Sequence, residues 1–374
     1  MAEPRKTNTD MKIKVLAPTE LRPNEMDAWH SIQADHPEYA NPFLGPGFAQ
    51  AVSAVRPTVR VAVAMQGSDP VAFLPFERGP LGIGRAVGLG VSDCQAVVQR
   101  PGAVSEAEPL LRACGLSVWE FDNLVGSAQP FSSYARTLHA SPVMDVSDGY
   151  ERYKERVSEH APRFVRTMGK YTRRLTRDFG NVRFVFDETD QDQLRTLMRW
   201  KSAQYRRTGR KDRFAQPWIT ELLTRLQATR MGQLTGLLSV LYSGDQPVAA
   251  HFGLRSERVL ACWFPAYDTR FYRYSPGLML HLRMAEEAAA AGLDYMDLGR
   301  GASEHKETLK TRELTVAEGW AALPSAGAVA HWLSRAPAER LCDAVLERPH
   351  LRRAARRTLN GLGMIRTRWA GHSE

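Results

Sequence analysis

Val259-Leu-Ala-Cys-Trp-Phe-Pro-Ala-Tyr-Asp-Thr-Arg-Phe-Tyr-Arg-Tyr-Ser-Pro-Gly277 opens the stretch that decides the fold, which runs on to Lys310. Its β-prone first part predicts a strand over 259–267. Apolar residues at helical spacing then predict a helix over 278–291, which Gly292 ends. A second strand is expected over 294–298, with a polar loop over 299–306. The pattern therefore predicts a strand–loop–helix–strand unit.

The start of this helix predicts a site for an anion. Ser275 is expected to be the N-cap, and Pro276 suits the first turn because its missing N–H would have no intrahelical partner. Gly277 allows a ligand to approach the backbone closely. The residues expected to bind a phosphate or pyrophosphate are Arg270, Arg273, Ser275, Gly277 and Leu278. Taken alone, the Ser-Pro-Gly turn is more typical of an ordinary strand–helix–strand unit than of a ligand site.

Composition narrows the class of protein. The chain has 374 residues, enough for two domains, and is 43% hydrophobic and 24% charged. Its net charge of +9 favours an anionic partner: a phosphorylated cofactor, a nucleic acid or an acidic membrane surface. The four cysteines form no CxxC pair, so neither a disulfide framework nor a metal site is expected. Without a signal peptide or an apolar run of about 20 residues, a cytoplasmic location is expected.

The order of predicted elements is similar in the two halves of the chain. In the first half, strands are expected over 11–16, 59–65, 70–76 and 118–124, and helices over 19–35, 48–55 and 105–113. In the second half, strands are expected over 182–186, 234–242, 248–254 and 259–264, and helices over 149–177, 191–205 and 218–228. This order predicts an α/β fold with mixed sheets and a duplicated unit. The expected domains are 1–147 and 148–326, followed by a basic helical tail over 327–374.

Two segments concentrate arginine. The predicted helix over 149–177 carries Arg163, Arg166 and further cations at steps of three and four residues, which place them on one helix face. Anion binding and a merely solvated face are equally compatible with this pattern. The tail is an arginine-rich amphipathic stretch that either docks on the protein or contacts an anionic membrane.

This order of elements resembles the GNAT acyltransferase fold. More specifically, it is similar to the CelD/BcsL-type acetyltransferases, which share two GNAT-like halves with the FemAB transferases. The matching motifs are 163–180, 245–254, Ala266-Tyr-Asp268, Ser275-Pro-Gly277 and Asp297 with Gly299, Gly301 and Lys306. The resemblance covers residues 150–310 well and the first half only through Asn41-Pro-Phe43. His305 departs from the aromatic residue that the family usually places before the lysine.

The resemblance implies an N-acyltransferase that uses acyl-CoA or an acyl-carrier thioester and no metal. The resemblance implies an amine or hydroxyl acceptor. The leading hypothesis is an amine in envelope lipid or saccharide biosynthesis, with long-chain, ceramide-type N-acylation as one form. The basic tail and the lack of an expected membrane span favour a location on the cytoplasmic side of the inner membrane. The residues expected to carry out catalysis are His251, Asp297, His305 and Lys306. Acyl transfer to an amine needs a base for the amine proton and a group that stabilises charge on the thioester oxygen. Tyr267, Asp268, Arg163 and Arg166 are expected to bind substrate. His251 is also compatible with a hydrogen-bonded core histidine, and Asp297 with a loop cap.

Two other functions stay open at this point. One is an aminoacyl-tRNA-dependent transferase, which the FemAB likeness suggests, although no coiled-coil arm is evident between the strands. The other is a non-catalytic protein that binds a membrane or a nucleic acid, of which the nucleic acid is the less expected partner. Salt-sensitive RNA binding without thioester turnover would favour that class.

Overall fold

The computed structural model describes residues 11–126, 128–231, 233–301 and 303–333. In chain order its first half contains β1 (Met11–Leu16), α1 (Pro23–Asp35), η3 (Pro42–Leu44), α2 (Pro46–Ser53), β2 (Val59–Gln66), β3 (Asp69–Arg78), β4 (Ile83–Arg85), β5 (Val98–Gln99), α3 (Ala107–Ala113), β6 (Val118–Val125) and β7 (Ala135–Asp145). The predicted strands and helices of this half are thus present, with small shifts at their ends.

The second half begins with two helices and ends with a long strand. It contains α4 (Tyr150–His160), α5 (Phe164–Phe179), β8 (Val182–Val185), α6 (Gln191–Arg207), α7 (Pro217–Gln227), β9 (Arg230–Met231), β10 (Leu234–Ser243), β11 (Gln246–Arg255), β12 (Val259–Tyr267), η7 (Thr269–Tyr274), α8 (Pro276–Ala290), β13 (Tyr295–Asp297), α9 (Glu304–Leu309) and β14 (Arg312–Ala322). The strand, helix and strand predicted around the Ser-Pro-Gly turn are confirmed as β12, α8 and β13.

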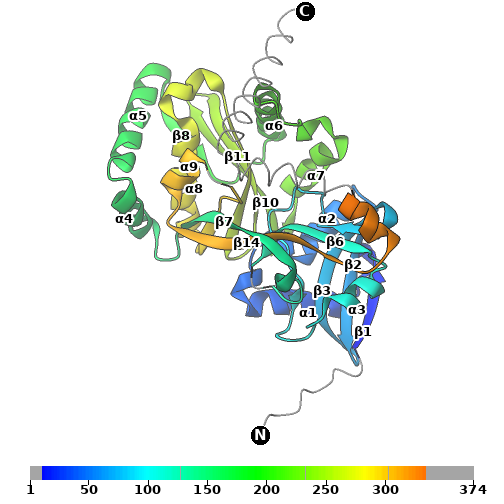
Figure 1. Ribbon diagram of the computed structural model, residues 1–374. Coiled ribbons are helices and arrows are strands. Elements are labelled where there is room, and N and C mark those ends of the chain that lie inside the picture. The colour runs from blue at the N-terminus through cyan, green and yellow to red at the C-terminus, as the bar shows by residue number, and fades with distance from the viewer. Residues whose placement is uncertain (1–10, 127, 232, 302, 334–374) are drawn as a thin grey trace, which may run out of the picture.

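A single mixed sheet joins the two halves. Its order is β1-β2-β3-β4-β6-β14-β7-β13-β12-β11-β10-β8, and most neighbours are antiparallel. In the second half, α6 and α7 cover one face of the sheet and α8 the other (Figure 1). The mixed α/β class predicted from the sequence is confirmed, whereas the two halves share one sheet instead of forming separate ones.

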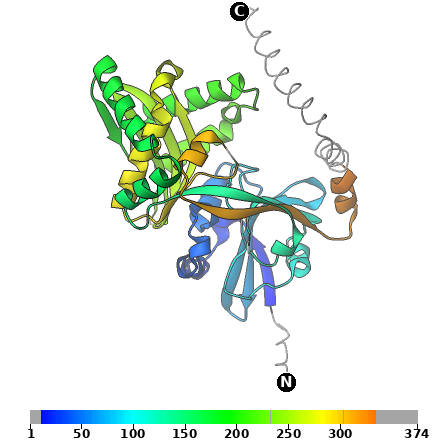
Figure 2. The same ribbon diagram turned by 60° about the vertical axis from the view of Figure 1, so that its left-hand side comes forward.

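The halves exchange their last strands. β7 follows the first half but pairs with β13, as in Met296 opposite Met144. β14 follows the second half but pairs with β6, as in Ala321 opposite Trp119. These two long strands lie side by side and cross between the halves, as Figure 2 shows. The seam of the molecule is therefore a hydrogen-bonded β-ladder and not a flexible linker.

Apolar packing fills both faces of the sheet. One cluster of buried side chains spans the first half and reaches α6 and α7. It includes Trp29, which stacks on Phe73 with the two ring centroids 4.8 Å apart. A second cluster lies between the sheet and α4, α5 and α8. Burying each large apolar side chain stabilises the fold by roughly 1.5–3 kcal/mol. The two clusters meet at the strands that surround the candidate site.

Two expectations about local structure were wrong. The basic helix predicted over 149–177 is broken between α4 and α5, because Pro162 has no N–H and disfavours helical geometry in the residue before it. The predicted polar loop over 299–306 ends inside helix α9, which begins at Glu304 and carries His305 and Lys306.

Two further expectations concern the membrane and the tail. Among the residues that the structure describes, no helix has the length and apolar character needed to cross a bilayer. The docking or membrane role expected of the tail falls largely on residues 334–374, outside the described part of the chain.

Candidate active site

A cleft of about 710 Å³ opens where β12 ends and α8 begins. Its walls come from α6, the end of β12, the start of α8 and the segment from Leu298 to Lys306, with one loop of the first half. The residues with ionisable or hydroxyl side chains that line it are Asp93, Lys201, Tyr205, Thr208, Arg210, Cys262, Tyr267, Tyr272, Ser275, His281, Arg300, Ser303, His305 and Lys306. The cleft thus lies at the junction of the two halves.

The start of α8 forms part of the cleft wall, as the sequence predicted. Ser275, Pro276, Gly277 and Leu278 all line it. The first N–H groups of a helix attract anions, although in α8 Pro276 has no N–H and the Leu278 N–H donates to the Ser275 carbonyl at 3.0 Å. A Cβ added to Gly277 would contact only Tyr267, at 3.8 Å from its Cδ1 atom, so the backbone here is open to a ligand.

Ser275 occupies the predicted N-cap position, but the prediction that its side chain caps the helix was wrong. This residue occupies the N-cap position with φ 51° and ψ 50°, a left-handed conformation, and its side chain makes no capping hydrogen bond. The left-handed conformation, which costs energy for any residue except glycine, turns the chain sharply from η7 into α8. The Ser275 side chain instead lines the cleft.

The two arginines expected to bind phosphate lie on η7 and do not line the cleft. The Arg270 guanidinium pairs with Asp268 at 2.6 Å, and this hydrogen-bonded pair holds the pKa of the Asp268 carboxyl below its usual value. Asp268 also caps η7 by accepting a hydrogen bond from the Arg270 N–H at 2.9 Å. Arg273 is exposed on the same turn. Of the predicted substrate-binding residues in this region, only Tyr267 lines the cleft.

Lys306 reaches the cleft from α9 and is held by backbone oxygens. Its Nζ donates to the Gly299 carbonyl at 2.8 Å and to the Arg300 carbonyl at 3.1 Å. Burial lowers the pKa of Lys306, and the nearby Asp93 and Asp297 carboxylates oppose that shift. An ammonium group has three donors, so one remains for a ligand. His305 lies beside it with a lowered pKa, first because of desolvation and then because of the Lys306 and Lys201 charges.

Lys201 on α6 is a second cation in this cleft that sequence reasoning missed. Its Nζ donates to the Pro265 carbonyl at 2.9 Å. Burial lowers its pKa to about 8, and the charges of Arg210 and Lys306 add to that effect. The sequence placed Lys201 only within an amphipathic helix, where nothing separates it from the other cations of that helix.

Asp93 is the acidic residue of the cleft, and it comes from the first half of the chain. Burial raises its pKa to about 7, and the Asp297 carboxylate adds to the increase, whereas Arg213 and Lys306 act against it. A Cβ on Gly299 would lie 3.4 Å from Asp93 Oδ2 and 4.0 Å from Lys306 Nζ. Asp93 and Lys306 therefore flank the same glycine. In the sequence, the only feature that singled out Asp93 was its position shortly after the glycine-rich segment that ends at Gly90.

Asp297 lies behind this wall and joins three segments. Its Oδ1 accepts from the Ser141 hydroxyl at 2.8 Å and from the Gly299 N–H at 2.9 Å, and its Oδ2 accepts from Asn41 Nδ2 at 3.1 Å. Burial raises its pKa, and these hydrogen bonds counteract the shift. It faces a different hollow from the one that holds Lys306. Its contacts lock β7, β13 and the entry to η3 together.

His251 is fully buried on β11 and does not line the cleft. Phe252 pairs with Phe264 and Gly253 with Cys262, so Trp263 is an extra residue that forms a β-bulge. The bulge frees the Trp263 N–H, which donates to His251 Nε2 at 3.2 Å. Burial lowers the pKa of His251 far enough to keep the ring neutral at pH 7. The expectation that His251, Asp297 and Lys306 share one cleft was therefore wrong.

His281, one turn into α8, lines the cleft together with His305. Its Nδ1 lies 2.7 Å from the Gly277 carbonyl oxygen. Because a carbonyl only accepts, Nδ1 carries the proton and Nε2 is the free acceptor. Burial lowers the pKa of His281 to about 4. The sequence pattern gave this residue only a place on the apolar face of the helix.

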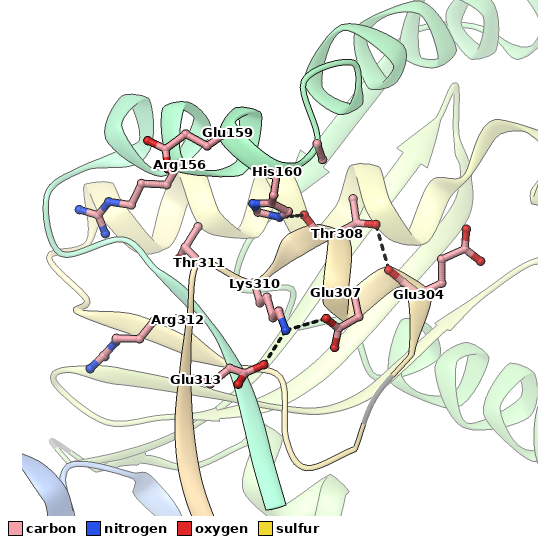
Figure 3. Close-up of a pocket in the computed structure, with 11 residues that line it drawn as sticks. Arg156, Glu159, His160, Glu304, Glu307, Thr308, Lys310, Thr311, Arg312 and Glu313 are labelled. Carbon is pink, nitrogen blue, oxygen red and sulfur yellow. Dashed lines mark hydrogen bonds and ion pairs between the residues drawn. The ribbon is translucent and has the colours of Figure 1, made fainter.

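A second hollow of about 780 Å³ lies between α4, α9 and the start of β14, and Figure 3 shows its lining. Three of its charged side chains form one cluster: Lys310 Nζ contacts Glu307 at 2.6 Å and Glu313 at 2.5 Å. The His160 ring meets the Thr308 carbonyl at 3.2 Å.

Two of the predicted residues lie away from both hollows. Arg163 and Arg166 are exposed on α5 and line neither of them. In the described ranges, no group of three or more His, Cys, Asp or Glu side chains is placed to hold a metal ion.

Comparison with protein families gives one match. Residues 162–307 match the family model of the acetyltransferase (GNAT) domain. This segment contains α5 to α9, and with them every cleft residue named above except Asp93. No curated protein sequence matches the chain.

Solved structures share the fold across most of the chain. The crystal structure of FemX is similar with a TM-score of 0.53 and 9% identity, covering 80% of this chain and 96% of that one. The C-terminal domain of a putative lysylphosphatidylglycerol synthetase from Agrobacterium fabrum is similar with a TM-score of 0.50 and 13% identity, covering 82% of this chain and 94% of that domain. At such identities the likeness concerns the fold alone.

Proposed function

We propose, from the premise that this chain is an acyltransferase of the GNAT family, that it moves an acyl group from a thioester donor to an amine. One observation carries the proposal: the anion-attracting start of α8, Asp93 and Lys306 all line the same cleft. The donor's phosphates bind at Ser275–Leu278, and its thioester extends toward Lys306. Acyl-CoA is the proposed donor, with an acyl-carrier thioester as the other form.

Asp93 is the proposed general base. A carboxylate with a pKa near 7 accepts a proton at neutral pH more readily than an ordinary one. The amine nitrogen attacks the thioester carbonyl and forms the C–N bond, Asp93 takes the amine proton, and the C–S bond breaks. The departing thiolate then takes up that proton, so the donor leaves as the free thiol and the Asp93 carboxylate is restored. His281 Nε2 and the His305 ring are the alternative acceptors of the amine proton in the cleft.

Lys306 and Lys201 are the proposed stabilisers of the developing oxyanion. Backbone oxygens fix both ammonium groups, and each keeps at least one N–H free, so little reorganisation is needed when charge develops. Cys262 also lines the cleft, but burial raises its thiol pKa, which makes a thiolate nucleophile unavailable near pH 7. Direct transfer without a covalent enzyme intermediate is therefore proposed.

The acceptor we propose is an amino lipid or amino sugar of envelope biosynthesis, with long-chain N-acylation as one form. We further propose that residues 1–147 and 148–326 are two GNAT-like halves. The repeated order of strand, two helices, antiparallel strands, helix and strand supports this division. In it, β7 and β14 are the exchanged last strands of the two halves.

The test is single-turnover transfer by the full chain. The protein is incubated with acyl-CoAs of increasing chain length and a panel of amines, and thiol release and amide formation are followed by absorbance and mass spectrometry. We expect release of one thiol for each amide formed, at a rate about 10²–10⁴-fold lower with Asp93→Asn. A folded protein that binds no CoA, acyl-CoA or acyl-carrier thioester and releases no thiol would refute the proposal. Lipid and metabolite profiles of a deletion strain then identify the acceptor.

A further inference from the structure

Helix α5 presents an uninterrupted cationic stripe to solvent. Its apolar side, formed by Phe164, Met168 and Leu175, is buried in the core. The opposite side carries exposed cations at steps of mostly three and four residues, which places them in one line along the helix. These residues are Arg163, Arg166, Lys170, Arg173, Arg174 and Arg177.

Most of this charge is not compensated by the protein. Arg174 and Arg177 both contact Asp178, at 3.7 Å and 2.8 Å. The other four cations have no carboxylate partner within the described ranges. Neighbouring α4 differs, since Lys154 pairs with Glu151 and Arg152 with Glu155. The surplus of positive charge is thus a property of α5 and not of this whole side of the molecule.

The 3-10 helix η7 extends the stripe and adds aromatic side chains. Phe179, at the end of α5, packs against Phe271 at 4.9 Å and Tyr274 at 5.9 Å. Arg270 and Arg273 are exposed on η7. Tyr272 lies between them with 68% of its surface exposed, and Phe179 remains 49% exposed. We call α5 and η7 together the α5–η7 face.

The extent of this face indicates the kind of partner. The 16 residues of α5 span about 24 Å, more than the phosphates of one nucleotide can cover. The helix lies on the outer side of the second half, away from the first half (Figures 1 and 2). A straight row of cations with exposed aromatic rings at one end suits a flat anionic surface into which the rings insert.

We propose that the α5–η7 face binds the anionic surface of a lipid bilayer. Tyr272 belongs both to this face and to the lining of the cleft, so the cleft opens beside the bound surface. An acidic carrier protein would meet the same charges. The length of the row and the protruding Tyr272 favour the bilayer. This inference concerns binding alone and holds whether or not the cleft performs acyl transfer.

The experiment is vesicle flotation with the full chain. One variant reverses three exposed cations of the stripe: Arg166→Glu, Lys170→Glu and Arg173→Glu. The matched control reverses three exposed cations of the first half, Lys12→Glu, Arg78→Glu and Arg100→Glu, and so changes the net charge equally. Vesicles rich in phosphatidylglycerol are compared with vesicles of phosphatidylcholine alone, at low and high salt. Circular dichroism and thermal unfolding verify that each variant is folded.

We expect the parent and the control to float with the anionic vesicles at low salt. The stripe variant should bind at least about tenfold more weakly, since each basic residue near the surface contributes to the attraction. Tyr272→Ala should reduce whatever binding remains at high salt, where charges are screened. The milder triple substitution to glutamine should show a smaller loss of the same kind.

Three outcomes would overturn the proposal. In one, the stripe variant and the control float equally well. In another, the parent fails to bind anionic vesicles at low salt, or binds neutral vesicles as strongly. In the third, the stripe substitutions abolish binding to an acidic acyl carrier protein and leave flotation unchanged, which would make the face a carrier-protein site.

Discussion

The backbone N–H of Trp263 donates a hydrogen bond to Nε2 of His251 at 3.2 Å. A β-bulge interrupts the ladder between β11 and β12 directly beneath the cleft, and this contact gives the Trp263 N–H a hydrogen-bond acceptor there. Since the ring is fully buried, its other nitrogen, Nδ1, cannot reach solvent, and it has no hydrogen-bond partner within the described ranges. This geometry supports a structural role for His251.

His251→Ala should therefore lower the free energy of unfolding substantially and change the rate of acyl transfer little. It leaves the Trp263 N–H buried without an acceptor, which costs about 1–3 kcal/mol, in addition to the cavity. Urea unfolding measures the loss, and single-turnover transfer by the folded variant should stay within about threefold of the parent. His251→Gln, which offers an acceptor, should recover part of the stability. A hundredfold slower transfer with a changed pH profile would instead make His251 a proton-transfer group.

Asp93→Asn should lower the rate of transfer by about 10²–10⁴-fold. In the parent, kcat/KM should rise with pH through about 7, because only the carboxylate accepts the amine proton. The variant should lose this limb of the profile and keep its affinity for the donor. Asp245→Asn, an exposed turn carboxylate outside the cleft, is the control. A parent-like pH profile in Asp93→Asn would move the base to His281 or His305.

Asp93 also predicts a pH dependence of stability. Its folded pKa of about 7 lies above the unfolded value, so the folded state binds more protons between about pH 4 and 7. Stability from this group is therefore lost as the pH rises through that window. Asp93→Asn should raise the melting temperature at pH 8 and leave it nearly unchanged at pH 4. Equal shifts at both pH values would contradict the raised pKa.

Substitutions at Gly277 should separate donor binding from folding. Gly277→Ala should be tolerated, since the added Cβ contacts only Tyr267, and should stabilise α8 by about 0.5–1 kcal/mol. Gly277→Leu should fill the cleft at the helix start and weaken CoA binding at least about tenfold in calorimetry. The control is Gly169→Leu, at a helical glycine of α5 with open surroundings. Unchanged affinity in a folded Gly277→Leu protein would remove α8 from the donor site.

Lys306→Met should lower kcat by about 10²–10³-fold with little effect on donor affinity, because the charge is needed when the oxyanion develops. Lys310→Met is the matched control, since Lys310 lies one turn further along but pairs with Glu307 and Glu313 outside the cleft. Lys201→Met should show a smaller loss of the same type. Equal activity of the Lys306 and Lys310 variants would exclude Lys306 from the reaction.

Local sequence patterns were sufficient for most secondary structure. The three strands before the Ser-Pro-Gly turn, the helix after it and the Gly292 end of that helix follow from periodicity and from backbone preferences of single residues. The same signals predicted that Gly277 and Leu278 line a site. They failed at Ser275, whose backbone is left-handed and whose side chain makes no capping hydrogen bond, and at Pro162, whose effect on the long basic helix was missed.

The sequence by itself determined the elements, the class of fold and the placement of a helix start beside a strand end, since these depend on neighbours along the chain. Only the tertiary structure decided that Asp93 from the first half lies beside the same glycine, Gly299, as Lys306, and that His251 and Asp297 do not line the cleft. It also decided the exchange of β7 and β14. The reason is physical: pairing between distant strands and the burial that shifts a carboxyl pKa arise from contacts that local periodicity does not encode.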